Sequence, residues 1–397
     1  MFDFANSAYI TVVVTVLGGL YWKNLLMEGR GDAEFWWGLA LGLANIIVVL
    51  LSPIVGALGD AMAKKKCFLL LSYLMCLCGM VVLGMPVVWT VAFAGLVLAH
   101  VGFALGENLI SSFLPEIARP QEVGRISALG WGIGYFGGLS SLGLALVVVE
   151  VWKCPVGWGI LATAVFFALA GLPTLLFLRE RAVARCSKAT TAVGDAVSVL
   201  CRSMAVLLCY RNLGLFFVSF FCLMAGLGNV VMFTSIFAQE QLGMSQSEII
   251  KMFVVLQLAA AIGAWVFGWL QDQAGSKTAL TVAITVWLGV VLAVLLVRDE
   301  LMFYSVAVLA GLAMGGSQST ARALVALLAP VGRNGEFYGF WGVFGKLSHV
   351  VGAPLFGWLA SIVGLRAALL STLGWFVLSF TTLLFVRSEK APCCKTD

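Results

Sequence analysis

The chain has 397 residues, of which 61% are hydrophobic and 11% are charged, and its mean hydropathy is +1.04. Soluble domains are roughly half apolar and a quarter charged, so this composition excludes an ordinary soluble protein. The formal net charge of +5 is compatible with a nucleic-acid partner, but the basic residues lie singly or in threes between apolar runs rather than along one face. We therefore predict an all-α polytopic membrane protein that lies in a lipid bilayer and binds no nucleic acid.

Apolar runs recur along the whole chain, near or above the ~18–20 residues that a helix needs to cross a bilayer. No long alternating pattern suggests a barrel of strands. We count twelve such runs, and an even number places both termini on the same side of the membrane. The predicted transmembrane helices cover residues 4–22, 35–58, 67–85, 88–114, 126–150, 156–178, 213–238, 247–270, 277–297, 301–329, 336–362 and 365–386.

The positive charges predict which side that is. If the loop that contains Lys64 to Lys66 is cytoplasmic, 16 of the 24 lysines and arginines lie on its side, 6 lie on the other side and 2 lie within spans (16 + 6 + 2 = 24). Cytoplasmic loops carry an excess of lysine and arginine, so we expect both termini in the cytoplasm. The short loops favour a bacterial cytoplasmic membrane over an organelle membrane.

The sequence predicts neither an enzyme nor a metalloprotein. Its ten cysteines lie mostly within apolar runs, and no metal-ligand cluster or phosphate-binding loop has a recognisable spacing. We expect no catalytic residue, no metal and no cofactor, and we expect a monomer.

Two loops repeat the same order of glycine, acid and base. The loop after the second span contains Gly56, Asp60 and three lysines, and the loop after the eighth contains Gly268, Asp272 and Lys277. The glycines and the acids are each separated by 212 residues (268 − 56 and 272 − 60), which indicates two related halves. We expect each acid to contact the N-terminus of another helix or a base across the cytoplasmic face. These contacts would keep the cytoplasmic side closed in a state that is open to the outside. The alternative is that the loops only orient the protein.

Six spans precede the longest polar connection and six follow it. We predict an N-terminal six-helix bundle at 1–178, a cytoplasmic linker at 179–211 with a surface helix near 193–208, a C-terminal six-helix bundle at 212–387 and a tail at 388–397. The linker is either a plain connection or a regulatory segment. Two parallel six-span repeats are the organisation of the major facilitator fold, in which two bundles rock about a site near the bilayer midplane.

Several stretches are recognisable in order along the chain. They are Phe2–Tyr9 (FDFANSAY), Phe113–Ile117 (FLPEI), Gly124–Tyr135 (GRISALGWGIGY), Gly315–Arg322 (GGSQSTAR) and Glu336–Lys346 (EFYGFWGVFGK). Together they resemble the UMF1 branch of the major facilitator superfamily, which includes the Atg22-like vacuolar effluxers. The resemblance covers the whole chain.

The resemblance implies secondary transport of a small solute by alternating access, with a possible proton as coupling ion and with efflux of amino acids as the best-known role of the branch. Two departures limit it. Ala61 and Ala63 replace the arginine and the glycine that are usual after the loop acid, and Cys222–Gly226 replaces an acidic stretch of the seventh span. The alternative functions are a membrane sensor or assembly factor that does not transport, and a lipid transporter.

Ionisable side chains are costly at the bilayer centre, so those within spans are functional candidates. Glu107 lies eight residues before Pro115, and Arg322 lies eight residues before Pro330, so the two occupy equivalent positions in the two repeats. We expect them to pair as a cytoplasmic gate or to bind opposite ends of a zwitterionic substrate. The alternative is a static pair or contacts with other groups.

Further candidates have one structural and one functional interpretation. Lys346 has no acid near it in sequence, so it either forms a structural salt bridge or contacts substrate. Asp3 and Asn6 open the first span, where they either cap the helix or belong to the site. His100 and His349 are either packing groups or proton carriers.

Four more side chains complete the predicted substrate and coupling site. Gln318 and Asn229 are expected to hydrogen-bond either the solute or a neighbouring helix. Trp131 and Tyr135 are expected either to shape the cavity or to pack between helices.

Overall fold

The structure is a computed structural model, and it describes residues 1–22, 33–181, 210–330 and 332–387. Among these residues eleven helices are long and apolar enough to cross a membrane, and the shorter apolar helix Phe2–Leu17 continues to Tyr21. With this first span the predicted count of twelve is reached, and the described residues contain no strand. The all-α fold is therefore confirmed, whereas the predicted surface helix of the linker and the tail lie outside the described residues.

The N-terminal bundle begins with a composite span. Here the α-helices α1 and α2 flank the π-helix η1, and a second π-helix, η3, ends α7. The elements are α1 (Phe2–Ala8), η1 (Tyr9–Leu17), α2 (Gly18–Tyr21), α3 (Ala33–Met62), α4 (Lys65–Gly84), α5 (Trp89–Ser112), α6 (Leu114–Ile117), α7 (Val123–Leu146), η3 (Val147–Val151) and α8 (Val156–Phe177).

The C-terminal bundle consists of six long helices, and each begins and ends within a few residues of its predicted span. They are α10 (Arg211–Leu242), α11 (Gln246–Ala274), α12 (Ser276–Leu296), α13 (Glu300–Leu328), α14 (Asn334–Val363) and α15 (Leu365–Leu384).

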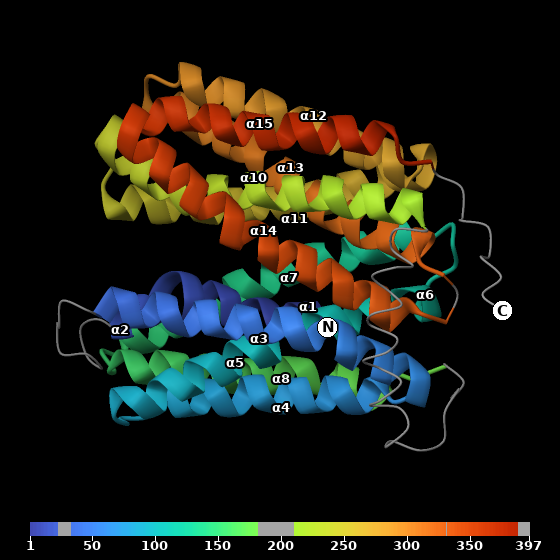
Figure 1. Cartoon of the computed structure of the whole chain (residues 1–397). Helices are drawn as coiled ribbons and strands as arrows, with labels where there is room; N and C mark the ends of the chain where they lie inside the picture. The colour runs from blue at the N-terminus through green and yellow to red at the C-terminus, as the bar shows by residue number, and fades with distance from the viewer. Residues whose placement is uncertain (23–32, 182–209, 331, 388–397) are drawn as a thin grey trace.

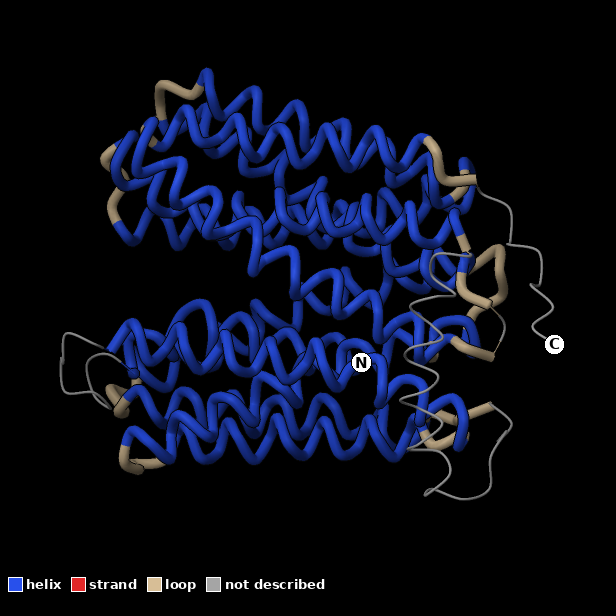
Figure 2. Tube along the Cα trace, viewed as in Figure 1, coloured by secondary structure: helices blue, strands red, loops and turns tan. Residues whose placement is uncertain are grey.

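Each half has its own hydrophobic core, as two layers of helices show in Figure 1. In the N-terminal half the buried cluster includes Tyr9, Tyr73 and Phe167, and in the C-terminal half it includes Phe216 and Trp287. Between helices that span a membrane, such rings stabilise the bundle by close packing rather than by removal from water. Figure 2 shows that the described chain is mostly helical in both layers, with loops at the ends of the helices. The two halves are thus separate six-helix bundles.

The bundles meet where α3 packs against α14 and α7 packs against α11 and α13. A methyl group added to Gly56 would come within 2.0 Å of the carbonyl oxygen of Gly335, and one added to Gly268 would come within 2.2 Å of Ala128 Cβ. The repeated glycines therefore permit close helix crossings between the bundles. These crossings lie toward the end of the molecule that contains the turn at Lys64 and helix α6, which we name the basic end (Figure 1).

Two helices of the C-terminal half, α11 and α13, begin with side-chain caps. The Ser245 hydroxyl accepts a hydrogen bond from the backbone of Glu248, and the Glu248 carboxylate accepts one from the backbone of Ser245. The hydrogen bonds from Ser245 lower the pKa of Glu248. Asp299 similarly caps α13 by accepting a bond from Met302 N at 2.8 Å.

The tight turns between neighbouring spans differ between the halves. Gly275 joins α11 to α12 with a φ of +85°, a conformation that glycine adopts without strain. The equivalent residue of the first half, 212 positions earlier, is Ala63, which has a φ of 49°. The departure from glycine noted in the sequence therefore places an alanine in the left-handed region, at a cost of about 1–2 kcal/mol.

We expect the substitution Ala63→Gly to stabilise the protein by about 1 kcal/mol, because it removes this strain at a small entropic cost. Thermal unfolding in detergent should show a melting temperature higher by about 1–3 °C. As the matched control, Ala94→Gly in the exposed face of α5 should lower the melting temperature, since glycine weakens a helix interior. A lower melting temperature for Ala63→Gly would contradict the assigned strain.

Candidate functional site

Arg322 of α13 crosses from the C-terminal bundle to the N-terminal one. Its Nη1 donates to Asp3 Oδ2 at 2.8 Å. Its Nε and Nη2 donate to the hydroxyl and the carbonyl oxygen of Ser127 at 3.1 and 2.7 Å. The Trp131 ring centre lies 5.5 Å from the guanidinium carbon, and Tyr338 donates to the backbone oxygen of Arg322 at 2.6 Å. Asp3, Ser127 and Trp131 together therefore hold a buried cation between the bundles.

The predicted ion pair of Glu107 with Arg322 is replaced by the pair of Asp3 with Arg322. Asp3 lies in the first turn of α1, where the helix dipole favours an acid, but α1 has no side-chain capping hydrogen bond. Packing explains the choice of partner. A methyl group at Gly130 would come within 2.4 Å of Asp3 Oδ2 and 2.5 Å of Arg322 Nη2, so the absent side chain of Gly130 leaves the space in which the pair forms. Glu107 forms no hydrogen bond or ion pair with another described residue.

Glu107 and Lys346 form a separated pair of opposite charges on α5 and α14. Both are half-buried. The Lys346 ammonium lies 5.5 Å from the ring centre of Phe103, which is one helical turn before Glu107. The charge of Lys346 acts on Glu107, and so do the charges of Asp3 and Arg322, but the described residues provide no ion pair for either side chain. Of the two cations across the bundles that act on Glu107, Lys346 acts more strongly than Arg322.

Polar and aromatic groups surround these charges. Tyr135 donates to Gln318 Oε1 at 2.6 Å, which joins α7 to α13, and its ring centre is 6.0 Å from that of Trp131. Asn6 donates to the carbonyl oxygen of Phe103 at 3.5 Å, while its buried Oδ1 has no partner among the described residues. We name the central cluster as Asp3, Asn6, Glu107, Trp131, Tyr135, Gln318, Arg322 and Lys346.

Asn229 lies apart from the central cluster. Its Nδ2 donates to Thr372 Oγ1 of α15 at 3.3 Å within the C-terminal bundle, so the described contact is one between helices. His100 is likewise held inside the N-terminal bundle, with Nε2 at 3.2 Å from Asn45 Oδ1 and Nδ1 at 3.4 Å from the Tyr9 hydroxyl. The structure therefore favours the packing interpretation for both side chains.

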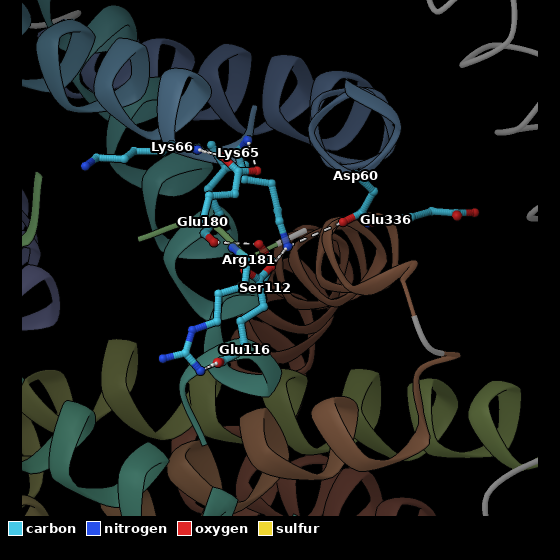
Figure 3. Close-up of polar contacts among 9 residues, drawn as sticks. Asp60, Lys65, Lys66, Ser112, Glu116, Glu180, Arg181 and Glu336 are labelled. Carbon is cyan, nitrogen blue, oxygen red and sulfur yellow. Dashed lines mark hydrogen bonds and ion pairs between the residues drawn. The ribbon is translucent and has the colours of Figure 1, made fainter. Parts of the chain in front are cut away.

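A network of charges surrounds Asp60 at the basic end (Figure 3). Asp60 Oδ2 accepts a hydrogen bond at 3.1 Å from the backbone N–H of Glu336, in the first turn of α14. Lys65, which is 1% exposed, lies with its Nζ at 3.5 Å from Asp60 Oδ1 and contacts the Glu116 carboxylate. Lys65 thus supplies the cation that the sequence lacks at Ala61.

The residues after α8 complete this network, as the close-up in Figure 3 shows. The Glu180 carboxylate accepts hydrogen bonds from the backbone N–H groups of Lys65 and Lys66 at 2.7 and 3.2 Å, where the helix dipole favours a negative charge. The Arg181 backbone and guanidinium donate to Glu116 at 3.0 and 3.2 Å. The end of the N-terminal bundle is therefore tied to the acid that Lys65 contacts.

Asp272 makes the equivalent contact in the second half with fewer charges. It accepts a hydrogen bond from the backbone of Arg125, at the start of α7. Its equivalent of Lys65 is Lys277, which donates instead to the carbonyl oxygen of Leu384 at 2.8 Å. Asp60 and Asp272 thus each lie against the start of a helix of the other bundle, and the residues whose backbone N–H groups donate to them, Glu336 and Arg125, are themselves 211 residues apart (336 − 125). The gating role of the two acids stays a prediction.

Sequence reasoning missed three contributors to this geometry. Ser127 and Glu116 bind the buried cations of Arg322 and Lys65, and Glu180 accepts from backbone N–H groups at the start of α4. None of the three is both charged and within an apolar run, which was the criterion for a candidate. The recognisable motifs around Ser127 and Glu116 were the available signal.

The family model for the vacuole effluxer Atg22-like proteins matches residues 38–393. The chain belongs to this family. It is 25% identical to the uncharacterised MFS-type transporter YxiO of Bacillus subtilis over 98% of this chain and 94% of that protein. Among solved structures, human MFSD10, an organic anion transporter, superposes with a TM-score of 0.75 at 17% identity over 96% of this chain and 97% of that one.

The Escherichia coli fucose:proton symporter FucP superposes with a TM-score of 0.72 at 14% identity, over 97% of this chain and 98% of that one. The structural likenesses show the major facilitator fold. This Atg22-like protein is therefore a multi-pass integral membrane transporter of the MFS type, with its central cluster at the interface of the two bundles.

We expect the Asp60 and Asp272 contacts both to hold the basic end closed, and Asp60 to matter more for the contact of α3 with α14, because Asp60 accepts from α14 whereas Asp272 accepts from α7. In a background without other cysteines, Ser52→Cys places a thiol in the buried contact of α3 with α14. Asp60→Asn should raise its rate of modification by a polar thiol reagent about tenfold, since a hydrogen bond to a charged group contributes about 1.5–3 kcal/mol. Asp272→Asn should raise the rate less. Equal rates in all three proteins would contradict a role of these acids in closure.

Proposed function

We propose that this transporter exports a small, amino-acid-like zwitterion by alternating access. The observation that supports this most is the separated pair of Glu107 and Lys346, two opposite charges on opposite bundles that are half-buried and lack an ion pair among the described residues. An unpaired charge at this depth is costly, and a ligand with the complementary charge offsets that cost.

The two charges have complementary partners on an α-amino acid. Lys346 binds the carboxylate, and Glu107 binds the ammonium group. Arg322 and Asp3 neutralise each other, so the four charges of the central cluster sum to zero and favour a solute without net charge. Asn6 supplies a buried carbonyl oxygen as a further acceptor.

The contacts between the bundles support the direction in which this state is open. The Asp60 and Asp272 contacts lie near the basic-end termini of α3 and α11, and the excess of lysine and arginine supports a cytoplasmic basic end. This state is then outward-facing, as is one solved conformation of FucP, which superposes with a TM-score of 0.72.

Three further assignments are part of the proposal. The family description as effluxers supports export, and the proton coupling named for FucP supports a proton as the coupling ion. The Bacillus relative supports a bacterial cytoplasmic membrane.

Counterflow of each of the twenty labelled L-amino acids into proteoliposomes tests this function. We expect at least one to exchange, and Lys346→Met to raise its half-saturating concentration tenfold or more, since a hydrogen-bonded charge contributes about 1.5–3 kcal/mol. Lys277→Met, which removes a lysine outside the central cluster, is the matched control and should leave that concentration unchanged.

Other results would identify a different function. Binding without exchange would indicate a sensor, and transfer of a fluorescent lipid without amino-acid exchange would indicate a lipid transporter. Either would contradict the proposal, and so would equal effects of Lys346→Met and Lys277→Met.

A further inference from the structure

The central cluster contains two acids, Asp3 and Glu107. Only Glu107 lacks a hydrogen bond or ion pair with a described residue. Asp3 is bound by Arg322 at 2.8 Å. Glu107 is half-buried and forms no hydrogen bond or ion pair with a described residue, although the charges of Lys346, Arg322 and Asp3 act on it. Glu107 is therefore the carboxylate of the cluster that can hold a small cation without first breaking a contact between the bundles.

The two histidines are poor carriers of a positive charge at this place. Both ring nitrogens of His100 have neighbours, Asn45 and the Tyr9 hydroxyl, which suit a neutral ring. The charge of Lys346 acts on both His100 and His349, so a proton on either ring would meet a like charge. Protonation of Glu107 produces no such added cation.

Charge balance makes the solute and the proton compete. The groups that face Glu107 are Asp3 from α1, Tyr135 from α7, Arg322 from α13 and Lys346 from α14. With Glu107 ionised the charged groups sum to zero, and the solute's ammonium finds a carboxylate. With Glu107 protonated the sum is +1, and the solute's ammonium loses its carboxylate partner although the solute's carboxylate can still bind Lys346.

We infer that Glu107 binds either the ammonium of the solute or a proton, but never both, so that the protein is a proton:solute antiporter. This rests on the proposed function and differs from the symport named for FucP. On the open side, a proton from water binds the Glu107 carboxylate when the solute leaves. On the basic side, the next solute's ammonium displaces that proton into water, so one proton enters for each solute exported.

The test uses every L-amino acid that gives counterflow, added to purified protein in weakly buffered detergent with a pH indicator. We expect binding to release up to one proton per solute as the pH is varied between 5 and 8. The dissociation constant should rise toward tenfold per pH unit on the acid side, because linkage makes the competition reciprocal. In proteoliposomes, an acidic outer face should drive the solute out.

Two variants of Glu107 and one histidine control distinguish Glu107 from the histidines as the proton-binding group. Glu107→Gln keeps an oxygen for the ammonium, so it should exchange more weakly, release no proton and lose its response to a pH gradient. Glu107→Asp should restore proton release. His100→Gln, the control for a histidine carrier, should keep both proton release and the response to a pH gradient.

The outcomes distinguish a failure of the antiport from a failure of the proposed amino-acid export. Amino-acid exchange without proton release, with a pH-independent dissociation constant or with proton and solute moving together would overturn the antiport but leave the proposed function. Loss of proton release in His100→Gln with its retention in Glu107→Gln would also overturn it. Failure of all twenty amino acids to exchange would remove the proposed function itself.

Discussion

The contact of Arg322 with the N-terminal bundle is the interaction on which the arrangement of the interior depends. A guanidinium that is 5% exposed must have its donors satisfied, and here Asp3 and Ser127 supply three acceptors. Removing one partner of such a buried pair costs about 3–5 kcal/mol. This pairing fixes where α13 meets α1 and α7, and it leaves Glu107 and Lys346 as the charges available to a solute.

The second constraint is the repeated contact of an acid with a helix N-terminus. In each half the acid lies in the last turn of a long helix and accepts from the backbone of the other bundle, where the free N–H groups of a helix favour a negative charge. The first half adds the buried Lys65, together with Glu116, Glu180 and Arg181. The two halves therefore share the contact between the bundles, whereas the additional charges of the first half lie within the N-terminal bundle.

Hydropathy and periodicity predicted the twelve spans within a few residues, because burial in lipid imposes the same length on every helix. The 212-residue repeat identified the acids that make equivalent contacts. Partners were harder to predict, since Asp3 and Arg322 are 319 residues apart and meet only because Gly130 leaves space between their helices. Sequence alone also could not show which of the three lysines, Lys64, Lys65 or Lys66, is buried. Nor could it show that Asn229 donates a hydrogen bond to α15.

The central claim is that charges between the bundles hold the basic end closed in this state. Spin labels at Lys64 and Gln273, which are exposed on opposite bundles near that end, report its width by double electron–electron resonance. Labels at Val151 and Leu301 report the other end. Arg322→Gln should shift the first distance distribution to longer values and the second to shorter values relative to the unsubstituted protein. Unchanged distributions at both ends, in a protein that still folds, would contradict the account.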